Sequence, residues 1–327
     1  MINKTEEEIM STWKTRDGDP LVTIRSITYN HVNYISDALD GFLNQVTNFK
    51  FEVIVHDDAS TDGTSDVIRK YAEKYPHIIT PIIQKENQYS KKNGGIRRAI
   101  NSNLRGKYIA LCEGDDYWTY QNKLAKQIAY MESHPDCSLS FHAVNYEQNG
   151  KIIKNDRISN KEKDIPSRNV ILGGGKYIAT PSICCRTVDF LDYPKFRLMA
   201  DVGDFPLQIM LADRGKVHYF PDLWGVYRVS SSGSWSESQK NREAQIRHLN
   251  NQIDWISEFD DYSKKRFFSE TRKEIAVCNL RLYKLGYISF KELMSIVNAL
   301  EPSKEKYIYY ISAIKNIPKN HRNSMCN

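Results

Sequence analysis

Residues 21–55 read LVTIRSITYNHVNYISDALDGFLNQVTNFKFEVIV and predict the first unit of the fold. The β-rich run Leu21–Ile27 reads as a strand, and Phe51–Val55 reads as a second one. Between them, apolar side chains recur at three- and four-residue steps along one helix face: Val32, Ile35, Leu39, Phe42, Leu43 and Val46. A strand, a helix and a strand in this order are typical of a parallel sheet covered by helices.

The same alternation continues through the first two-thirds of the 327 residues. We expect further strands at residues 78–83, 108–111 and 138–144, and helices at residues 64–74 and 122–133. The sequence therefore predicts an α/β fold with a mostly parallel central sheet flanked by helices.

The pattern changes in two places further along the chain. Residues 151–168 are polar and lack periodicity, so we expect a loop or a mobile connection there. Beyond residue 238 the pattern is helical to the end, with helices expected at residues 242–259, 264–285, 289–300 and 303–314. We therefore expect an α/β domain over residues 1–238 and a C-terminal helical region over residues 239–327.

Composition excludes several classes of protein. With 40% hydrophobic and 26% charged residues, the chain is globular rather than disordered. It has no run of about 18 apolar residues that could span a membrane, and Met1–Asp19 lacks the apolar core of a signal peptide. We therefore expect a cytoplasmic protein. The six cysteines lack the spacing of a zinc site, which indicates inert thiols.

The charge of the chain indicates the kind of partner. A net charge of +6 fits an anionic substrate or an anionic membrane face, and it is too small to indicate nucleic acid. The C-terminal tail is aromatic and basic: Lys304, Lys306, Tyr307, Tyr309, Tyr310, Lys315, Lys319 and Arg322. Such a tail fits peripheral contact with the inner face of a membrane, and equally a packing helix or a homo-oligomer contact.

Three polar clusters fall at the ends of predicted strands: Thr28-Tyr29-Asn30-His31, Asp57-Asp58, and Glu113-Gly114-Asp115-Asp116-Tyr117-Trp118. One such cluster alone is usually a helix cap or a solvated loop. In open α/β sheets, however, ligands bind beyond the carboxyl ends of the strands. Three clusters at one sheet edge therefore favour a binding site.

The acidic cluster after residue 112 indicates a metal ion. Glu113, Asp115 and Asp116 bring three carboxylates within four positions, and their repulsion is unfavourable unless a cation is bound. Hard oxygen ligands select Mg²⁺ or Mn²⁺, which usually bind through one or two carboxylates plus substrate phosphates. This is the chemistry of a nucleoside diphosphate leaving group. The alternative is an acidic loop that starts the helix at Asn122.

Three segments together resemble the family 2 glycosyltransferases: Ser26–Asn30, residues 53–64 and Gly106–Trp118. The resemblance covers roughly residues 20–235 and is nearest to the polysaccharide-assembly branch, in which the D-x-D motif takes the form EGDDYW. It implies a GT-A type fold, with a nucleotide-binding half near residues 20–145 and an acceptor half near 146–238.

The same resemblance implies roles for individual residues. The nucleotide would be held by Thr28, Tyr29, Asn30 and Asp58. Asp115 would bind Mn²⁺ or Mg²⁺ with support from Asp116, while Glu113 would face the ribose or a metal-bound water. A carboxylate at Asp58 can accept the N3–H of uracil or thymine, which favours a UDP- or dTDP-sugar donor.

Two further motifs match the family's pattern. Asp204 aligns with the general base, and Asp201 is its competitor; either could instead cap the following helix. Arg228 belongs to a Tyr-Arg segment that closes over the diphosphate in the family. Ser230 stands where many relatives carry a histidine, and the Ser- and Gly-rich stretch up to Trp235 fits either a lid or an exposed loop.

The leading interpretation is an inverting glycosyltransferase that moves a sugar to a hydroxyl of a glycan or lipid-linked glycan in cell-surface polysaccharide synthesis. A nucleotidyltransferase is the first alternative, but it needs a glycine-rich phosphate loop, and Tyr29–Tyr34 contains no glycine. A non-catalytic sugar-nucleotide-binding module is the second. It would keep Asp58 but would not need both Asp115 and Asp204.

Overall fold

The computed structural model describes residues 2–229, 241–300 and 302. The chain divides into two compact units. The first, which we call the sheet unit, is drawn from residues 1–166, 176–192 and 210–237, and the second, the helical unit, from residues 167–175, 193–209 and 238–327. The division of the chain into a catalytic domain and a C-terminal region at residue 238 stays a prediction.

The first half of the sheet unit is parallel, as the β-α-β pattern predicts. Its neighbouring strands are, in spatial order, β3 (Ile79–Ile83), β2 (Phe51–Asp57), β1 (Val22–Thr28) and β4 (Tyr108–Leu111). β2 is buried along its whole length, since helices cover both faces of a parallel sheet.

The second half of the sheet is mixed. β9 (Cys184–Arg186) pairs antiparallel with both β4 and β6 (Cys137–Gln148), and β10 (Lys216–Arg228) pairs parallel with β6. β5 (Tyr117–Trp118) pairs antiparallel with β10. The sheet is therefore mixed as a whole, because one short reversed strand separates its two sets of parallel strands.

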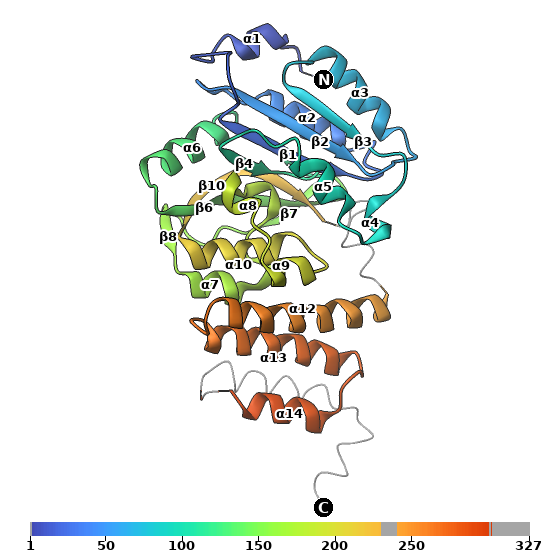
Figure 1. Ribbon diagram of the computed structural model, residues 1–327, viewed down its shortest axis with the longest axis vertical. Coiled ribbons are helices and arrows are strands. Elements are labelled where there is room, and N and C mark those ends of the chain that lie inside the picture. The colour runs from blue at the N-terminus through green and yellow to red at the C-terminus, as the bar shows by residue number, and fades with distance from the viewer. Residues whose placement is uncertain (1, 230–240, 301, 303–327) are drawn as a thin grey trace, which may run out of the picture. The chain divides into compact units, whose positions relative to one another are not determined.

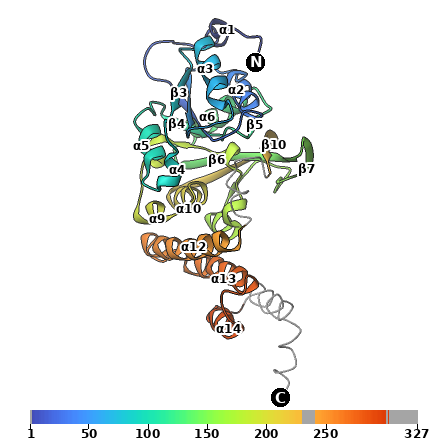
Figure 2. The same cartoon turned by 90° about the vertical axis from the view of Figure 1, so that its right-hand side faces the viewer.

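The segment expected to be a loop at residues 151–168 contains two strands instead. β7 (Lys151–Asn155) pairs with β6, and β8 (Lys163–Ile165) pairs with β10. Figure 2 shows β7 at one end of the sheet, beside β6 and β10. The prediction was wrong because every residue of β7 is exposed, so the strand has no buried face to impose alternation on its sequence.

Seven described helices belong to the sheet unit in addition to part of α10 (Figure 1): α1 (Glu6–Met10), α2 (Ile35–Leu43), α3 (Thr64–Lys74), α4 (Gln88–Lys91), α5 (Gly95–Asn101), α6 (Lys123–Ser133) and α8 (Thr187–Phe190). α2 buries Ile35, Leu39, Phe42 and Leu43 of the predicted apolar face, whereas Val32 and Val46 lie outside the helix and Val46 is exposed. Phe42 meets the ring of Trp118 edge to face at 4.9 Å, and a Cβ at Gly41 would come within 2.9 Å of the Trp118 carbonyl oxygen. This contact fixes α2 next to the chain that follows β4.

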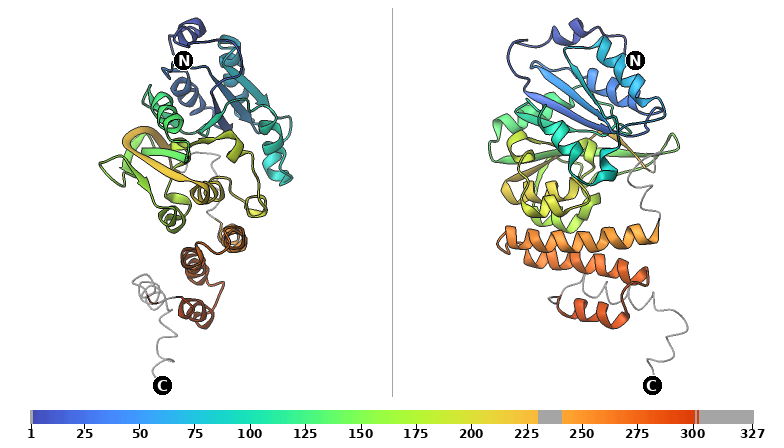
Figure 3. Two further views of the ribbon diagram at one scale, coloured as in Figure 1. Left: turned by 60° about the vertical axis from the view of Figure 1, so that its left-hand side comes forward. Right: turned by 45° about the vertical axis from the view of Figure 1, so that its right-hand side comes forward.

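The helical unit is built around α12 (Arg242–Tyr262), α13 (Phe268–Lys284) and α14 (Phe290–Asn298), with the shorter helices α7 (Ser167–Gly173) and α9 (Lys195–Met199). Figure 3 shows α12, α13 and α14 side by side in chain order. Apolar residues of α12 and α13 form one buried cluster: Ile246, Leu249, Cys278 and Leu282. These three helices confirm the expected helices at 242–259, 264–285 and 289–300. The helix expected at 303–314 and the basic tail lie outside the described residues.

In the part of the chain that the structure describes, no helix combines the length and apolar composition needed to cross a membrane. The described cysteines are buried and form no disulfide among the described residues: Cys112, Cys137, Cys184, Cys185 and Cys278. Burial raises the pKa of Cys184 to about 11, so its thiolate is scarce at neutral pH. The burial of these five agrees with the expectation of inert thiols, and Cys326 lies outside the described residues.

Candidate active site

The three predicted polar clusters meet at the carboxyl ends of three neighbouring strands in the sheet unit. β1 lies between β2 and β4, and all three strands run in the same direction, so their carboxyl ends are neighbours. The N–H of Gly114 donates to the carbonyl of Ile27 at 2.8 Å, and the N–H of Asp58 donates to the carbonyl of Thr28 at 3.0 Å. The clusters are thus joined through the end of β1.

The side chain of Glu113 is hydrogen-bonded to the neighbouring strand β1. Its carboxylate accepts a hydrogen bond from Arg25 Nη1 at 3.1 Å and another from the N–H of Ile27 at 2.9 Å. Burial raises the pKa of Glu113, although the positive charge of Arg25 opposes the shift. These bonds anchor the acidic loop to β1. The expected contact of Glu113 with a ribose or a metal-bound water stays a prediction.

The side chain of Asp116 is hydrogen-bonded to β10. Its side chain is 2% exposed, and Oδ1 accepts the N–H of Arg228 at 2.8 Å. Burial raises the pKa of Asp116 well above its ordinary value, and the negative charge of Asp115 adds to the shift. The bond joins the acidic loop to the end of β10. A supporting role for Asp116 at a metal stays a prediction.

Asp115 lies between these two anchored neighbours and is 8% exposed. Gly114 must be glycine here, because a Cβ would come within 2.6 Å of Thr28 Cβ. The loop therefore passes directly over the end of β1. The hydroxyl of Thr28 is buried there without a hydrogen-bond partner among the described residues.

Arg228 has a different environment from the one expected of a phosphate ligand. Its Nε donates to Glu147 at 2.9 Å, Nη1 to the carbonyl of Asp115 at 3.1 Å and Nη2 to Asp37 at 2.5 Å. The guanidinium also lies 4.5 Å from the ring centre of Tyr117. In this structure Arg228 holds the acidic loop to α2 and β6, and its contact with a diphosphate stays a prediction. Ser230 and the predicted lid up to Trp235 lie outside the described residues.

The loop after β1 carries two residues that are expected to bind the nucleotide, Tyr29 and Asn30, and their environments differ. Tyr29 is 36% exposed, so its ring is accessible to a base. Asn30 adopts φ of 56° and accepts the N–H of Thr61 at 2.9 Å, while its own N–H donates to Ser60 Oγ at 2.8 Å. Asn30 therefore ties the β1 loop to the β2 loop. Contacts of these residues with a nucleotide stay predictions.

Asp58 is 2% exposed, and both of its oxygens accept backbone hydrogen bonds. Oδ1 accepts from the N–H of Gln88 at 2.7 Å, and Oδ2 accepts from the N–H of Tyr89 at 2.9 Å. Each carboxylate oxygen has a second lone pair, so these bonds are compatible with a further donor such as a base N3–H. Its role at the base stays a prediction.

His31 has no role that the sequence alone predicts. This side chain is 5% exposed, and its Nε2 lies 3.9 Å from Oδ2 of Asp115. Neither ring nitrogen has a hydrogen-bond partner among the described residues. The polar cluster after β1 includes His31, but no local pattern shows that the ring is buried next to Asp115.

The two candidates for the general base belong to the helical unit. Asp204 opens α10 (Asp204–Arg214), and its Oδ1 accepts the N–H of Phe205 at 2.8 Å. Asp201 faces Nδ1 of His248 at 2.9 Å, and its N–H donates to Asn251 at 2.9 Å. Asp201 is therefore held by α12. Which of the two acts as base stays a prediction.

The residues around Asp115 fit a metal ion that takes its remaining ligands from the substrate. Within the described residues, no group of three or more histidine, cysteine, aspartate or glutamate side chains could hold a metal ion by itself. Mg²⁺ and Mn²⁺ commonly use one or two carboxylates plus substrate phosphates. Asp115 offers the hard oxygens, and the unpartnered polar atoms of Thr28 and His31 lie around its loop.

Comparison with known protein families and relatives agrees with this geometry. The family model described as "Glycosyl transferase family 2" matches residues 23–191. An uncharacterised protein of Mycobacterium tuberculosis is 37% identical over 230 residues, covering 68% of this chain and 62% of the relative. The Escherichia coli protein WfaP, a UDP-Glc:alpha-D-GlcNAc-diphosphoundecaprenol beta-1,3-glucosyltransferase, is 35% identical over 113 residues, covering 35% of this chain and 42% of that protein. This chain thus spans about 62% of the length of the M. tuberculosis relative.

Solved structures show the same fold. TarS of Staphylococcus aureus (residues 1–349) in complex with UDP-GlcNAc matches with a TM-score of 0.55 at 15% identity, covering 90% of this chain and 88% of that one. A mannosyltransferase of Pyrobaculum calidifontis, in complex with GDP-Man and Mn²⁺, matches with a TM-score of 0.55 at 15% identity, covering 95% and 85%. At this identity the likeness supports the GT-A-like α/β fold alone.

Proposed function

The chain belongs to glycosyltransferase family 2, and we propose that it is an inverting enzyme that transfers a sugar from a UDP- or dTDP-sugar to a hydroxyl of a glycan acceptor. The observation that carries this proposal is the acidic loop at the end of β4. Arg25 and Arg228 hold its flanking carboxylates and backbone, which presents Asp115 beside two unpartnered buried side chains.

The proposed reaction needs one residue to act on the acceptor and another to act on the donor. Asp204 takes the proton of the acceptor hydroxyl as that oxygen attacks the anomeric carbon, which inverts the configuration in one displacement. The bond from the anomeric carbon to the diphosphate breaks in the same step. Asp115 holds the divalent ion, Mn²⁺ or Mg²⁺, which when bound supplies positive charge to the leaving diphosphate.

We propose the nucleobase of the donor from two residues, Tyr29 and Asp58. The solved neighbours bind both a uridine and a guanosine donor, so the fold does not choose between them. Tyr29 offers an accessible ring for stacking, and Asp58 is a buried acceptor for N3–H. The bare N3 of cytosine would be repelled by that carboxylate. We therefore expect UDP or dTDP to bind more tightly than CDP or GDP.

The acceptor is proposed from the relatives. WfaP acts on a sugar linked to diphosphoundecaprenol, which favours a lipid-linked glycan for this chain as well. An acceptor of that kind would bring the protein to the inner face of a membrane, where the basic tail would contribute attraction to anionic lipids.

Slow hydrolysis of the donor tests the proposal and separates it from its alternatives. A transferase should release UDP or dTDP from one nucleotide sugar when Mn²⁺ is present and should stop when the metal is chelated. A nucleotidyltransferase should instead release pyrophosphate from a nucleoside triphosphate, and a binding module should release nothing. Calorimetry with the four diphosphates and Mn²⁺ tests the base; tightest binding of GDP or CDP would overturn the assignment of Asp58.

A further inference from the structure

His31 is a buried side chain that the proposed reaction leaves without a task. It is 5% exposed, and neither ring nitrogen has a hydrogen-bond partner among the described residues. Buried polar groups in native proteins are nearly always paired, so an unpaired one calls for a specific explanation. The ring lies at the edge where the carboxyl ends of β1 and β4 meet, next to Asp115.

The backbone of His31 is fixed on both sides. Its N–H donates to Thr64 Oγ1 at 2.9 Å, and its carbonyl accepts the N–H groups of Tyr34 and Ile35, each at 2.9 Å. The imidazole also meets the ring of Tyr34 edge to face at 6.2 Å. These contacts hold the imidazole beside the acidic loop. The distance of 3.9 Å from Nε2 to Oδ2 of Asp115 is longer than a hydrogen bond, so the two groups are close but not bonded in this structure.

We infer that His31 is a positioning residue for Asp115. In the donor complex its Nε2–H donates to Oδ2 of Asp115, which orients that carboxylate toward the divalent ion. The inference rests on the proposed function, because it needs Asp115 to hold that ion. Partners of metal-binding side chains fix ligand orientation, and their loss typically weakens metal affinity about 10- to 100-fold.

Binding of Mn²⁺ to the full chain tests this inference without measuring turnover. The loss of the free Mn²⁺ signal in electron paramagnetic resonance gives the affinity, with saturating UDP present and with UDP absent. His31→Leu removes both nitrogens and keeps an apolar volume, whereas His31→Gln keeps an N–H near the position of Nε2. His142→Leu is the matched control, because His142 is 1% exposed with an unpartnered Nε2 but lies in β6.

We expect His31→Leu to weaken Mn²⁺ binding in the UDP complex about 10- to 100-fold. His31→Gln should recover most of that loss, and His142→Leu should bind Mn²⁺ as the unaltered protein does. The melting temperature of His31→Leu should not fall, since the ring nitrogens make no hydrogen bond that the change would break.

Two results would overturn the inference. One is wild-type Mn²⁺ affinity in His31→Leu; the other is an equal loss in His31→Leu and His31→Gln, which would indicate ring shape rather than an N–H donor. Asp115→Asn separates these failures from a failure of the proposed function. If Asp115→Asn loses Mn²⁺ and His31→Leu does not, only the positioning role is wrong. If Asp115→Asn binds Mn²⁺ normally, the proposed metal role fails and the inference fails with it.

Discussion

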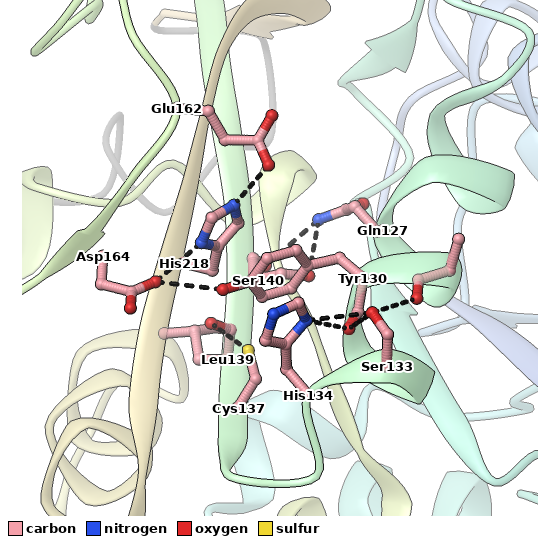
Figure 4. A network of polar contacts seen from close by, with 11 residues as sticks. Gln127, Tyr130, Ser133, His134, Cys137, Leu139, Ser140, Glu162, Asp164 and His218 are labelled. Carbon is pink, nitrogen blue, oxygen red and sulfur yellow. Dashed lines mark hydrogen bonds and ion pairs between the residues drawn. The ribbon is translucent and has the colours of Figure 1, made fainter.

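Two buried histidines of the sheet unit differ in what surrounds them. His218 is 4% exposed and lies near the start of β10, where Nδ1 is 2.8 Å from Asp164 and Nε2 is 2.9 Å from Glu162 (Figure 4). The ring of Tyr130 stacks on the ring of His218, with 3.5 Å between the ring centres, and on the ring of His134, with 4.0 Å between the ring centres. His31 is equally buried at the opposite edge of the sheet, yet neither of its nitrogens has such a partner among the described residues.

The difference separates a structural cluster from a candidate ligand site. Both ring nitrogens of His218 lie within hydrogen-bond distance of a carboxylate, one from Asp164 and one from Glu162. This cluster needs nothing further and joins β8 to β10. The ring nitrogens of His31, in contrast, have no hydrogen-bond partner among the described residues. Such unpartnered groups are expected at a site where a charged substrate supplies the missing partners. Substitutions on the two sides should therefore have opposite effects on activity and stability.

The largest effect is expected at Asp115. Asp115→Asn should reduce Mn²⁺-dependent turnover by up to about a thousandfold, the upper end of the range for loss of one electrostatic group at a transition state. Stability should not fall, because the negative charge of Asp115 disfavours ionisation of Asp116. Donor hydrolysis with and without a chelator, together with thermal melting, measures both. Full activity of the variant in the presence of the chelator would contradict the proposal.

The next effect is expected at Asp204. Asp204→Asn should cut turnover by about two to four orders of magnitude, the usual contribution of a general base. Donor affinity should change little, because the base acts on the acceptor. Asp201→Asn is the matched control: it loses the pair with His248 and should keep most of the activity. If the Asp201 variant is crippled and the Asp204 variant is not, the assignment is wrong by three residues.

Lys123 tests whether an unpartnered buried group always belongs to a site, since it too is buried without a hydrogen-bond partner among the described residues. Its Nζ lies 3.9 Å from the centre of the Trp118 ring, and burial lowers its pKa to about 8. The unfolded chain then holds more protons than the folded chain between about pH 8 and pH 10.5. Folding stability should therefore rise across this window, by an amount on the order of 3 kcal/mol.

Lys123→Met should remove this rise and leave turnover unchanged. Urea unfolding at pH 7, 8, 9 and 10 measures the first part, and donor hydrolysis measures the second. A stability profile that still rises above pH 8 in the variant would assign the effect to another group. Loss of turnover in a folded Lys123→Met protein would mean that the unpartnered lysine serves the site, as His31 is proposed to do.

The smallest effect is expected at His218. His218→Leu should lower the free energy of unfolding by about 1–2 kcal/mol, because two charge-assisted hydrogen bonds are lost to carboxylates that are half exposed. Turnover should not change. Burial alone would raise the pKa of Asp164, but hydrogen bonds from His218 and Tyr130 lower it below 3.8 overall. The contribution is therefore present above the unfolded pKa of 3.8 and is lost as pH falls through the lower folded value.

Urea unfolding of both proteins at pH 7 and at pH 2.5 checks this linkage. The difference between them should be present at pH 7 and should shrink in acid. A difference that stays constant down to pH 2.5 would show that packing of the ring on Tyr130, and not its charge, supplies the stability.

The parallel half of the sheet, and the strand ends that carry the candidate site, could be predicted from the sequence alone. Helix and strand periodicities are local, so residues 21–55 suffice to predict β1, α2 and β2 in parallel order. The polar clusters after β1, β2 and β4 then had to meet, because carboxyl ends of neighbouring parallel strands share an edge. The family resemblance rested on those same local segments.

The hydrogen-bond partners of the carboxylates in the acidic loop, in contrast, depend on tertiary contacts. Glu113 is held by Arg25, which lies 88 residues away in the chain, and Asp116 is held by Arg228, which lies 112 residues away. No local pattern encodes such pairs, and the same is true of the reversed strand β9 and the burial of His31. Periodicity reports which face of an element is covered, but not which distant side chain covers it; that depends on how the whole sheet is assembled.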